Sequence, residues 1–275
     1  MNDAVSNHEI KSEGSNKAGT KRLSSVTNAI HLLKAFSPED PELGISELAR
    51  RLGVAKSTIH RLATALASEG LLQQNPDSGR YYLGLELFSL GAQVRSRLSV
   101  TSETKIILNQ LRDITQENVR LGVFDGLNVV YLHDFESPHA VRLRSTTGES
   151  RPAFCTAEGL CLLSDLGEPE ISEFLKHPRE RRTEKTIIDE QSIRTRIRLI
   201  ERRGYAIEEE ECEEGTRCIA APVFSHSKRM IAAVGVVGPR LRLKKSQYPD
   251  IFPQVLSAAA QLTKKLGNPS LDHSF

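Results

Sequence analysis

Long apolar runs, clustered cysteines and an excess of charge are all missing from this chain of 275 residues. No apolar stretch approaches the roughly 20 residues that a membrane-spanning helix requires, and no charged-then-apolar leader stands at the start. The four cysteines are too few for a disulfide framework in a chain of this length, which fits a reducing compartment. We therefore expect a cytoplasmic protein without membrane contact.

Charge is nearly balanced as well. The formal net charge of +2 excludes a general polycation, and the chain is long enough for two domains that each bury a core. Residues 1–98 hold 12 Lys and Arg against 10 Asp and Glu, so the whole positive excess lies in this first part of the chain. Within it, residues 1–22 are polar and lack apolar periodicity, and we expect them to form a disordered tail.

A helix-turn-helix is predicted between Leu43 and Leu72. Gly53 supplies the tight turn, and Ser46 stands where it would cap the first helix. Apolar residues recur at helical spacing on both sides of the turn, at Ile45, Leu48, Ala49 and Leu52 and then at Ile59, Leu62, Ala63 and Leu66. A similar stripe over residues 24–36, which includes Val26 and Ile30, predicts a helix before this pair.

The outward face of the second helix has the chemistry of a DNA contact. From Lys56 to Ala67 no Asp or Glu occurs, although 26% of the chain is charged. Short hydroxyls and cations reach phosphates and base edges in a major groove, where acidic side chains are repelled. The alternative is a helical hairpin inside a larger core, with polar residues that are merely solvated. The candidate DNA-binding residues on this helix are Lys56, Ser57, Thr58, His60, Arg61 and Thr64.

A small β-hairpin is expected directly after the second helix. Gly70 ends that helix, residues 76–79 supply a turn, and the pairs Leu71-Leu72 and Tyr81-Tyr82 flank it. Arg80 at the base of the hairpin is a candidate phosphate or minor-groove contact. A helix-turn-helix followed by such a hairpin is a winged helix, so we place a DNA-binding domain at residues 23–83.

A connector helix is predicted at residues 84–98, where one stripe carries Leu87, Leu90, Val94 and Leu98. One small winged domain makes few contacts with double-stranded DNA. We therefore expect a homodimer that binds an inverted repeat, with this stripe as a candidate seam. The alternative role of the stripe is packing within one chain.

Residues 99–268 are predicted to form one α+β domain, followed by a tail at residues 269–275. Asp125-Gly126 is the strongest hairpin signal in the chain. The alternation of Val141 and Leu143 with arginines predicts a strand over Ala140–Arg144. The other expected elements are helices over residues 100–117, 156–166, 169–175, 189–203 and 247–266, and strands over residues 205–211, 218–224 and 230–237.

With these elements in place, the chain resembles the IclR family of bacterial transcription regulators. The resemblance rests on the helix-turn-helix with its hairpin, on the TAEG motif at Thr156–Gly159, and on Arg202–Pro239, where GTRCIAAPVF precedes a strand ending in Gly-Pro. It covers nearly all of residues 24–266 and implies a winged helix-turn-helix joined by a helix to a GAF-like effector-binding domain. It also implies dimers that often pair into tetramers on DNA, and a regulator of a catabolic operon, a repressor or a dual regulator, without enzymatic activity or cofactor.

The resemblance further implies an effector pocket in the second domain. Its lining offers few hydrogen-bond donors, and an ionised Glu208 would repel a second negative charge. We therefore expect a neutral, hydroxylated or cationic metabolite, such as an aromatic catabolic intermediate or its ester or lactone. An inward-turned side chain among Arg142, Arg144 and Arg151 would instead favour an anion. The implied effector-binding residues are Leu143, Ala157, Glu158, Gly159, Glu208, Thr216, Cys218, Gly235 and Val237.

Two other kinds of site can be assembled from the same segments. The cysteines form two pairs with a spacing of six, and His133 and the glutamates of residues 208–214 could join them around a metal, but structural zinc sites use gaps of roughly two to four residues. These glutamates are instead expected on a solvated strand edge, and no metal is expected. Cys218 with a histidine and a glutamate could form a thiol hydrolase site, but no nucleophile motif surrounds it. A small-molecule sensor without DNA binding would leave the acid-free helix unexplained.

Overall fold

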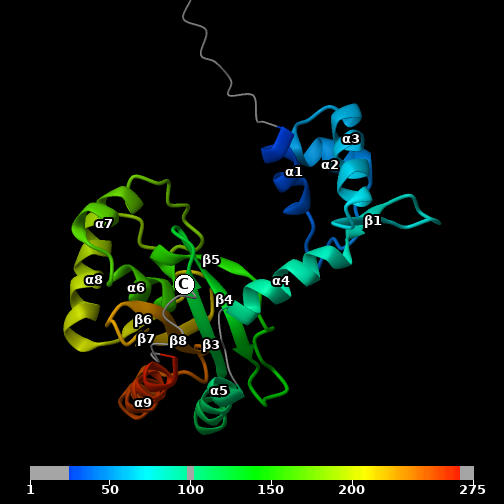
Figure 1. The fold of residues 1–275 in the computed structure, drawn as a ribbon. Helices are drawn as coiled ribbons and strands as arrows, with labels where there is room; N and C mark the ends of the chain where they lie inside the picture. The colour runs from blue at the N-terminus through cyan, green and yellow to red at the C-terminus, as the bar shows by residue number, and fades with distance from the viewer. Residues whose placement is uncertain (1–24, 98–101, 267–275) are drawn as a thin grey trace, which may run out of the picture. The chain divides into compact units, whose positions relative to one another are not determined.

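The computed structural model describes residues 25–97 and 102–266, which divide into two compact units between Ala92 and Gln93 (Figure 1). The tails expected at residues 1–22 and 269–275 lie outside the described residues, as does Leu98 of the connector stripe. Helix α4 (Leu85–Arg97) contains the division between the units. Within the described ranges, no helix is both long enough and apolar enough to cross a membrane.

The first unit is a three-helix domain with a two-stranded wing. Its apolar faces meet in one core, in which Leu32, Leu48 and Ile59 are fully buried. The winged helix-turn-helix predicted from the sequence is therefore confirmed. Its elements are helices α1 (Ser25–Leu33), α2 (Ile45–Leu52) and α3 (Lys56–Ser68), followed by the antiparallel strands β1 (Leu72–Gln74) and β2 (Tyr81–Leu83) (Figure 1).

Two local expectations for this unit are wrong. Gly44, and not Ser46, is the N-cap of α2, and no side chain caps its first turn. In α1, Val26 and Ile30 are 69% and 46% exposed, while Leu32 is fully buried. A helix of nine residues with apolar side chains on several faces does not define its buried face until its partners α2 and α3 are in place.

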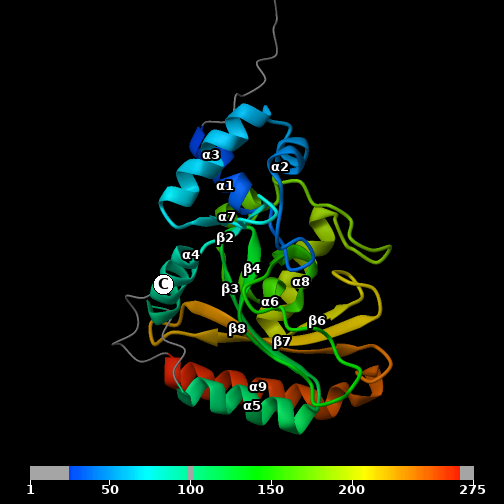
Figure 2. The same ribbon diagram turned by 90° about the vertical axis from the view of Figure 1, so that its right-hand side faces the viewer.

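The second unit is built around a six-stranded antiparallel sheet with the order β5-β4-β3-β8-β7-β6. The strands are β3 (Asn118–Phe124), β4 (Asn128–Phe135), β5 (Ser150–Pro152), β6 (Ala206–Glu209), β7 (Thr216–Phe224) and β8 (Met230–Pro239). Helices α5 (Ser102–Thr115) and α9 (Tyr248–Leu266) lie side by side on one face (Figure 2). The other face is covered by α6 (Ala157–Leu163), with α7 (Glu168–Phe174) and α8 (Glu190–Arg203) packed beyond it. The α+β class is therefore confirmed.

Alternation along the central strands separates two kinds of surface. On β3, Val119 and Leu121 enter the apolar core formed with α5 and α9. Arg120, between them, faces the α6 side of the sheet, where it meets Tyr131 from β4. One face of the sheet therefore builds the core, and the other contributes polar side chains beneath α6.

The strand expected over Ala140–Arg144 does not form. The backbone of residues 136–149 is irregular, and β4 pairs instead with the short strand β5. Side chains from elsewhere in the unit take backbone carbonyls of this segment, since Arg242 donates to the carbonyl of Val141 at 2.7 Å and Asn118 to the carbonyl of Leu143 at 3.2 Å. Side-chain bonds of this kind satisfy backbone groups that a strand would have paired.

Candidate functional site

Helix α3 presents the polar face that the sequence predicted for a DNA contact. Ile59 and Ala63 are fully buried, which turns the opposite face outward. The N-cap is Ala55, so no side chain occupies the N–H groups of the first turn, and these groups can meet a phosphate. Thr64 donates its hydroxyl to the carbonyl of His60 at 2.9 Å. Of the candidate residues, Thr58 is half-buried and the others on this helix are exposed, namely Lys56, Ser57, His60, Arg61 and Thr64.

Arg80 has partners inside its own domain. Its guanidinium donates to the carbonyl of Glu42 at 2.8 and 3.2 Å and contacts the carboxylate of Glu47 at 3.2 Å. Arg51 binds the same Glu47 at 2.7 Å. The side chain of Arg80 is still 46% exposed. It therefore anchors the wing to α2, and a phosphate contact would share its guanidinium with these two acceptors.

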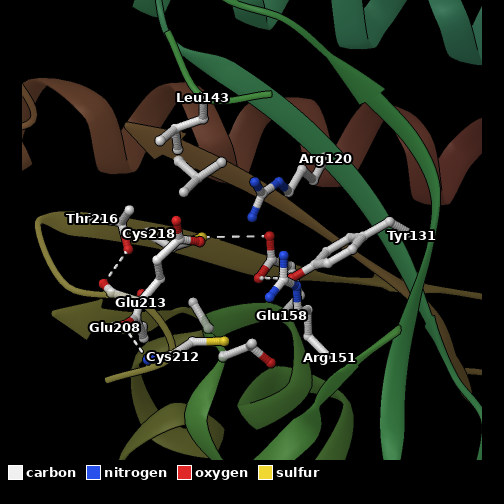
Figure 3. A pocket seen from close by; sticks show the side chains of 13 residues that line it. Arg120, Tyr131, Leu143, Arg151, Glu158, Glu208, Cys212, Glu213, Thr216 and Cys218 are labelled. Atoms are coloured by element: carbon white, nitrogen blue, oxygen red, sulfur yellow. Dashed lines mark hydrogen bonds between the residues drawn. The ribbon is translucent and has the colours of Figure 1, made fainter. Parts of the chain in front are cut away.

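The second unit holds a small cavity between α6 and the sheet (Figure 3). Its volume is about 20 Å³, which is room for about one water molecule. All six strands of the sheet contribute to its walls. The lining residues are Arg120, Tyr131, Leu143, Arg151, Thr156, Ala157, Glu158, Glu208, Cys212, Glu213, Thr216, Cys218 and Val237.

Seven of the nine residues implied by the family resemblance line this cavity, and Gly159 and Gly235 do not. A Cβ on Gly159 would lie 2.4 Å from the backbone of Ala153, and a Cβ on Gly235 would lie 2.4 Å from a carboxylate oxygen of Glu158. Both glycines therefore lie behind the lining, where they let α6 and the Glu158 side chain approach their neighbours closely.

Arg120 is the lining residue with the largest consequence, and the sequence did not single it out. Its Nε donates to Asp134 Oδ2 at 3.0 Å, and its guanidinium lies 5.0 Å from the ring centroid of Tyr131. Burial opposes its charge, but Tyr131, Asp134 and Glu158 keep its pKa above the ordinary value. A cation between two apolar residues of a central strand was a usable signal, because alternation places it on the face opposite the core.

Two buried carboxyl groups also line this cavity. Glu158 lies at the centre of the cavity, near Arg120 and Tyr131 (Figure 3), and accepts a hydrogen bond from the thiol of Cys218 at 3.4 Å. Burial raises the pKa of Glu158. Burial also raises the pKa of Glu208 to about 8, against the opposing effect of hydrogen bonds from the backbone N–H groups of Cys212 and Glu211. At neutral pH Glu208 is therefore mostly protonated and does not repel an anion.

The glutamates after Ile207 do not form a solvated strand edge. Glu208, Glu210 and Glu211 are 3%, 8% and 6% exposed. Glu209 turns to the opposite side, where it accepts a hydrogen bond from the Tyr248 hydroxyl at 2.9 Å. Glu210 has a left-handed backbone with φ 62°, which ends the alternation of β6. Ion pairs and hydrogen bonds within the second unit offset the burial of these carboxylates.

The expectation of a donor-poor pocket is also wrong. Arg151 lines the cavity together with Arg120, so two guanidinium groups can meet a ligand. Arg142 and Arg144 are exposed and bind Glu136 and Glu149 at 2.7 and 2.9 Å. One of the three arginines that would admit an anion therefore lies at the cavity, and β3 supplies another.

Cys218 is not prepared for nucleophilic chemistry. Burial, together with the nearby Glu158 and Glu208, raises the pKa of its thiol well above the ordinary value. No histidine is among the residues that line the cavity in the described part of the chain. A thiol hydrolase needs a thiolate and a base beside it, and this arrangement favours neither. Within residues 25–97 and 102–266, no group of three or more His, Cys, Asp or Glu side chains is placed to hold a metal ion.

Comparisons with known proteins match both units. The IclR helix-turn-helix domain model matches residues 25–76, and the model of the C-terminal domain of the bacterial transcriptional regulator IclR matches residues 92–264. The chain is 30% identical to the HTH-type transcriptional regulator XynR of Escherichia coli K12, over 90% of this chain and 99% of that protein. The crystal structure of an IclR transcriptional regulator from Alicyclobacillus acidocaldarius superposes with a TM-score of 0.75 at 25% identity, over 87% of this chain and 97% of that one. An IclR homologue from Microbacterium hydrocarbonoxydans, crystallised with 4-hydroxybenzoate, superposes with a TM-score of 0.73 at 23% identity, over 88% and 99% of the two chains.

Proposed function

This chain belongs to the IclR family of bacterial transcription regulators, and we propose that it represses a catabolic operon and responds to a small carboxylate metabolite. The observation that supports this proposal is the combination of an acid-free, outward-facing helix α3 with an arginine-lined cavity in a separate unit. Helix α3 supplies the DNA contact, and the cavity supplies the ligand contact. The two are coupled if ligand binding changes the affinity for the operator.

For the DNA contact, we propose that α3 enters the major groove. Arg61 is exposed on the face opposite Ile59 and Ala63, and its forked guanidinium suits the two acceptors on the edge of a guanine. Lys56 and Ser57 lie in the first turn, where a cation, a hydroxyl and uncapped N–H groups favour phosphate oxygens. The base contact would select the sequence, and the phosphate contacts would fix the position of the helix.

Substitution of Arg61 and Arg80 tests this assignment on a fragment footprinted upstream of the gene. Arg61→Ala should cost about 1–3 kcal/mol at the specific site and much less on unrelated DNA, because it removes a base contact. Arg80→Ala should weaken binding to all sequences alike and flatten its salt dependence, because it removes a cation at the wing. Arg112→Ala, which removes a half-buried arginine of the second unit, is the control. Unchanged affinity in both test variants would reject the assignment.

For the ligand, we propose a monocarboxylate with an apolar body, such as an aromatic acid. Arg120 and Arg151 supply charged donors for the carboxylate, and protonated Glu208 adds a hydroxyl. Ala157 and Val237 supply the apolar side of the lining. Such a mixture of apolar walls and a few convergent polar groups is typical of metabolite sites.

Binding of such a molecule requires movement, because the cavity of about 20 Å³ is far smaller than the roughly 300–1,000 Å³ of usual ligand sites. Most of the lining is held on strands and on α6. Leu143 lies instead on the irregular segment 136–149, where Asn118 holds its carbonyl at 3.2 Å. We infer that the ligand displaces this segment, and that the displaced arrangement has a different operator affinity.

Calorimetry with 4-hydroxybenzoate, benzoate and methyl benzoate tests the ligand class. The acids should bind and the ester should not, because only the acids pair with the guanidinium groups. Arg151→Ala should weaken binding of the acids by about 1.5–3 kcal/mol. Arg144→Ala is a matched control, since Arg144 and Arg151 both bind Glu149 but only Arg151 lines the cavity. An ester that binds as tightly as its acid would contradict the proposal.

A further inference from the structure

The fold brings Cys155 and Cys212 together from distant parts of the sequence. Cys155 ends the short helix η1 (Ala153–Cys155), and Cys212 lies in the loop between β6 and β7. Both belong to one apolar cluster, in which the thiol of Cys155 is placed to donate either to the sulfur of Cys212 or to the carbonyl of Pro152 at 3.7 Å. The other two cysteines have different partners, since Cys161 donates to the carbonyl of Ala220 and Cys218 to Glu158.

The two members of this pair have unequal surroundings. Cys155 is fully buried, whereas Cys212 is partly exposed and lines the cavity beside Glu208 (Figure 3). Arg182 donates to the carbonyl of Cys212 at 3.1 Å. The hydrogen bond from Cys155 and the charges of Arg182 and Arg151 outweigh burial and lower the pKa of Cys212 to about 7. Cys212 is therefore the accessible, more acidic thiol that reacts first with an oxidant. The buried Cys155 is the resolving cysteine, which then forms the disulfide with it.

We propose that Cys155 and Cys212 form a dithiol switch that peroxide oxidises to a disulfide at the wall of the effector cavity. In the first step the Cys212 thiolate attacks one oxygen of hydrogen peroxide, the O–O bond breaks, and hydroxide leaves and takes up a proton. The product is a Cys212 sulfenic acid. In the second step the sulfur of Cys155 attacks that of Cys212, the S–O bond breaks, and water leaves with the thiol proton. Two thiols are oxidised, one peroxide is reduced to two waters, and a dithiol reductant reverses the change.

The oxidised pair would act on the cavity through one hydrogen bond. The backbone N–H of Cys212 donates to Glu208 Oε1 at 3.1 Å. Because Cys155 is held in the core, closing the sulfurs to the roughly 2.05 Å of a disulfide displaces mainly Cys212 and its loop. Glu208 then loses a backbone donor that fixes the orientation of its carboxyl group. Its hydroxyl is no longer held in position for the ligand, and we expect weaker binding of a carboxylate ligand. This last effect rests on the proposed function, whereas the thiol chemistry does not.

Peptide mass mapping of the reduced full-length protein after treatment with hydrogen peroxide tests the switch. The expected product is a disulfide between Cys155 and Cys212 that dithiothreitol reverses. Cys161→Ala should form the same disulfide, and Cys155→Ala should stop at a Cys212 sulfenic acid that dimedone traps. Direct oxidation of Cys212 to sulfinic acid in the intact chain, a disulfide that uses Cys161 or Cys218, or unreacted thiols would overturn the proposal.

Alkylation gives a second measurement that needs no variant. In the wild-type protein, iodoacetamide should modify Cys212 first, with a pH midpoint near 7 and a rate at neutral pH on the order of tenfold above that of an ordinary thiol. A midpoint like that of free cysteine would contradict the role of Cys212. Binding of 4-hydroxybenzoate is then compared in the reduced and oxidised forms. If the disulfide forms but neither form binds the acid, the effector proposal fails and the dithiol stands.

Discussion

Glu208 links the geometry of a single residue to the pH dependence of stability. Its carboxyl is almost fully buried, and burial raises its pKa to about 8 in the folded protein. In the unfolded chain the same carboxyl titrates near its ordinary value of about 4.3. Between these values the folded state binds more protons than the unfolded state. The free energy of unfolding therefore falls as pH rises from about 4.5 to about 8.

We predict that Glu208→Gln flattens this decline, because the amide does not titrate. One group changes the free energy of unfolding by at most about 1.4 kcal/mol per pH unit, and Glu158 contributes a further decline that remains. Urea unfolding followed by circular dichroism, at several pH values between about 5 and 8, measures the slope. Glu213→Gln is the control, because Glu213 lines the same cavity but is exposed. Equal slopes for wild type and Glu208→Gln would contradict the burial of a protonated carboxyl.

Gly159 allows a second prediction, because we expect Gly159→Ala to destabilise the fold although helix propensity favours alanine over glycine. Alanine usually stabilises a helix by up to about 1 kcal/mol relative to glycine. At Gly159 the added Cβ would lie 2.4 Å from the backbone of Ala153, which cannot move aside as a side chain could. We expect Gly159→Ala to cost about 1–3 kcal/mol, measured by thermal unfolding. Gly91→Ala in α4 meets nothing within 4 Å and should be neutral or stabilising. Equal effects of the two variants would show that α6 is not held this closely.

At the scale of the elements, apolar spacing predicted the features that depend on residues close together in the sequence. Ile59 and Ala63 alone orient α3, so its outward face followed from the sequence. The cavity depends on distant pairings instead. Spacing within β3 or β4 does not show that Arg120 and Tyr131 lie beneath α6, because only the sheet order brings them there. The strand predicted at residues 140–144 does not form for another reason, since the side chains of Arg242 and Asn118 take the carbonyls of Val141 and Leu143 that a strand would have paired.

The segment 136–149 carries the prediction that concerns movement. Leu143→Ala should tighten binding of 4-hydroxybenzoate about fivefold, because the ligand no longer has to displace the leucine side chain, a gain of about 1 kcal/mol. Calorimetry measures the change. Val141→Ala lies on the same segment, and Val141 is 78% exposed, so this control should bind as the wild type does. Weaker binding by Leu143→Ala would mean that the leucine contacts the ligand instead of standing in its place.

For the whole molecule, helix α4 shows an unusual amount of apolar surface. Leu85, Phe88, Leu90 and Val94 are 73%, 70%, 46% and 57% exposed in a single chain. Single exposed apolar side chains are ordinary, but four on a helix of 13 residues indicate a covered surface. Helical spacing places Phe88, Leu90 and Val94 within about half of the circumference. Of the stripe predicted from the sequence as a candidate seam, Leu90 and Val94 are exposed and Leu87 is half-buried.

We therefore propose that this surface of α4 binds a second copy of the chain, and that the dimer binds an inverted repeat through two α3 helices. Ultracentrifugation should show a dimer for the wild type, and Val94→Asp should give a monomer because it places a charge in an apolar seam. Operator affinity of this variant should fall by at least about tenfold, since one winged domain makes too few contacts alone.

Ser89→Asp is the control, because it adds the same charge to α4 outside the Phe88–Leu90–Val94 arc and should leave the dimer intact. A tetramer on DNA would appear as two dimers per operator fragment. A wild type that is monomeric both free and on DNA, or a Val94→Asp variant that dimerises normally, would remove α4 as the seam.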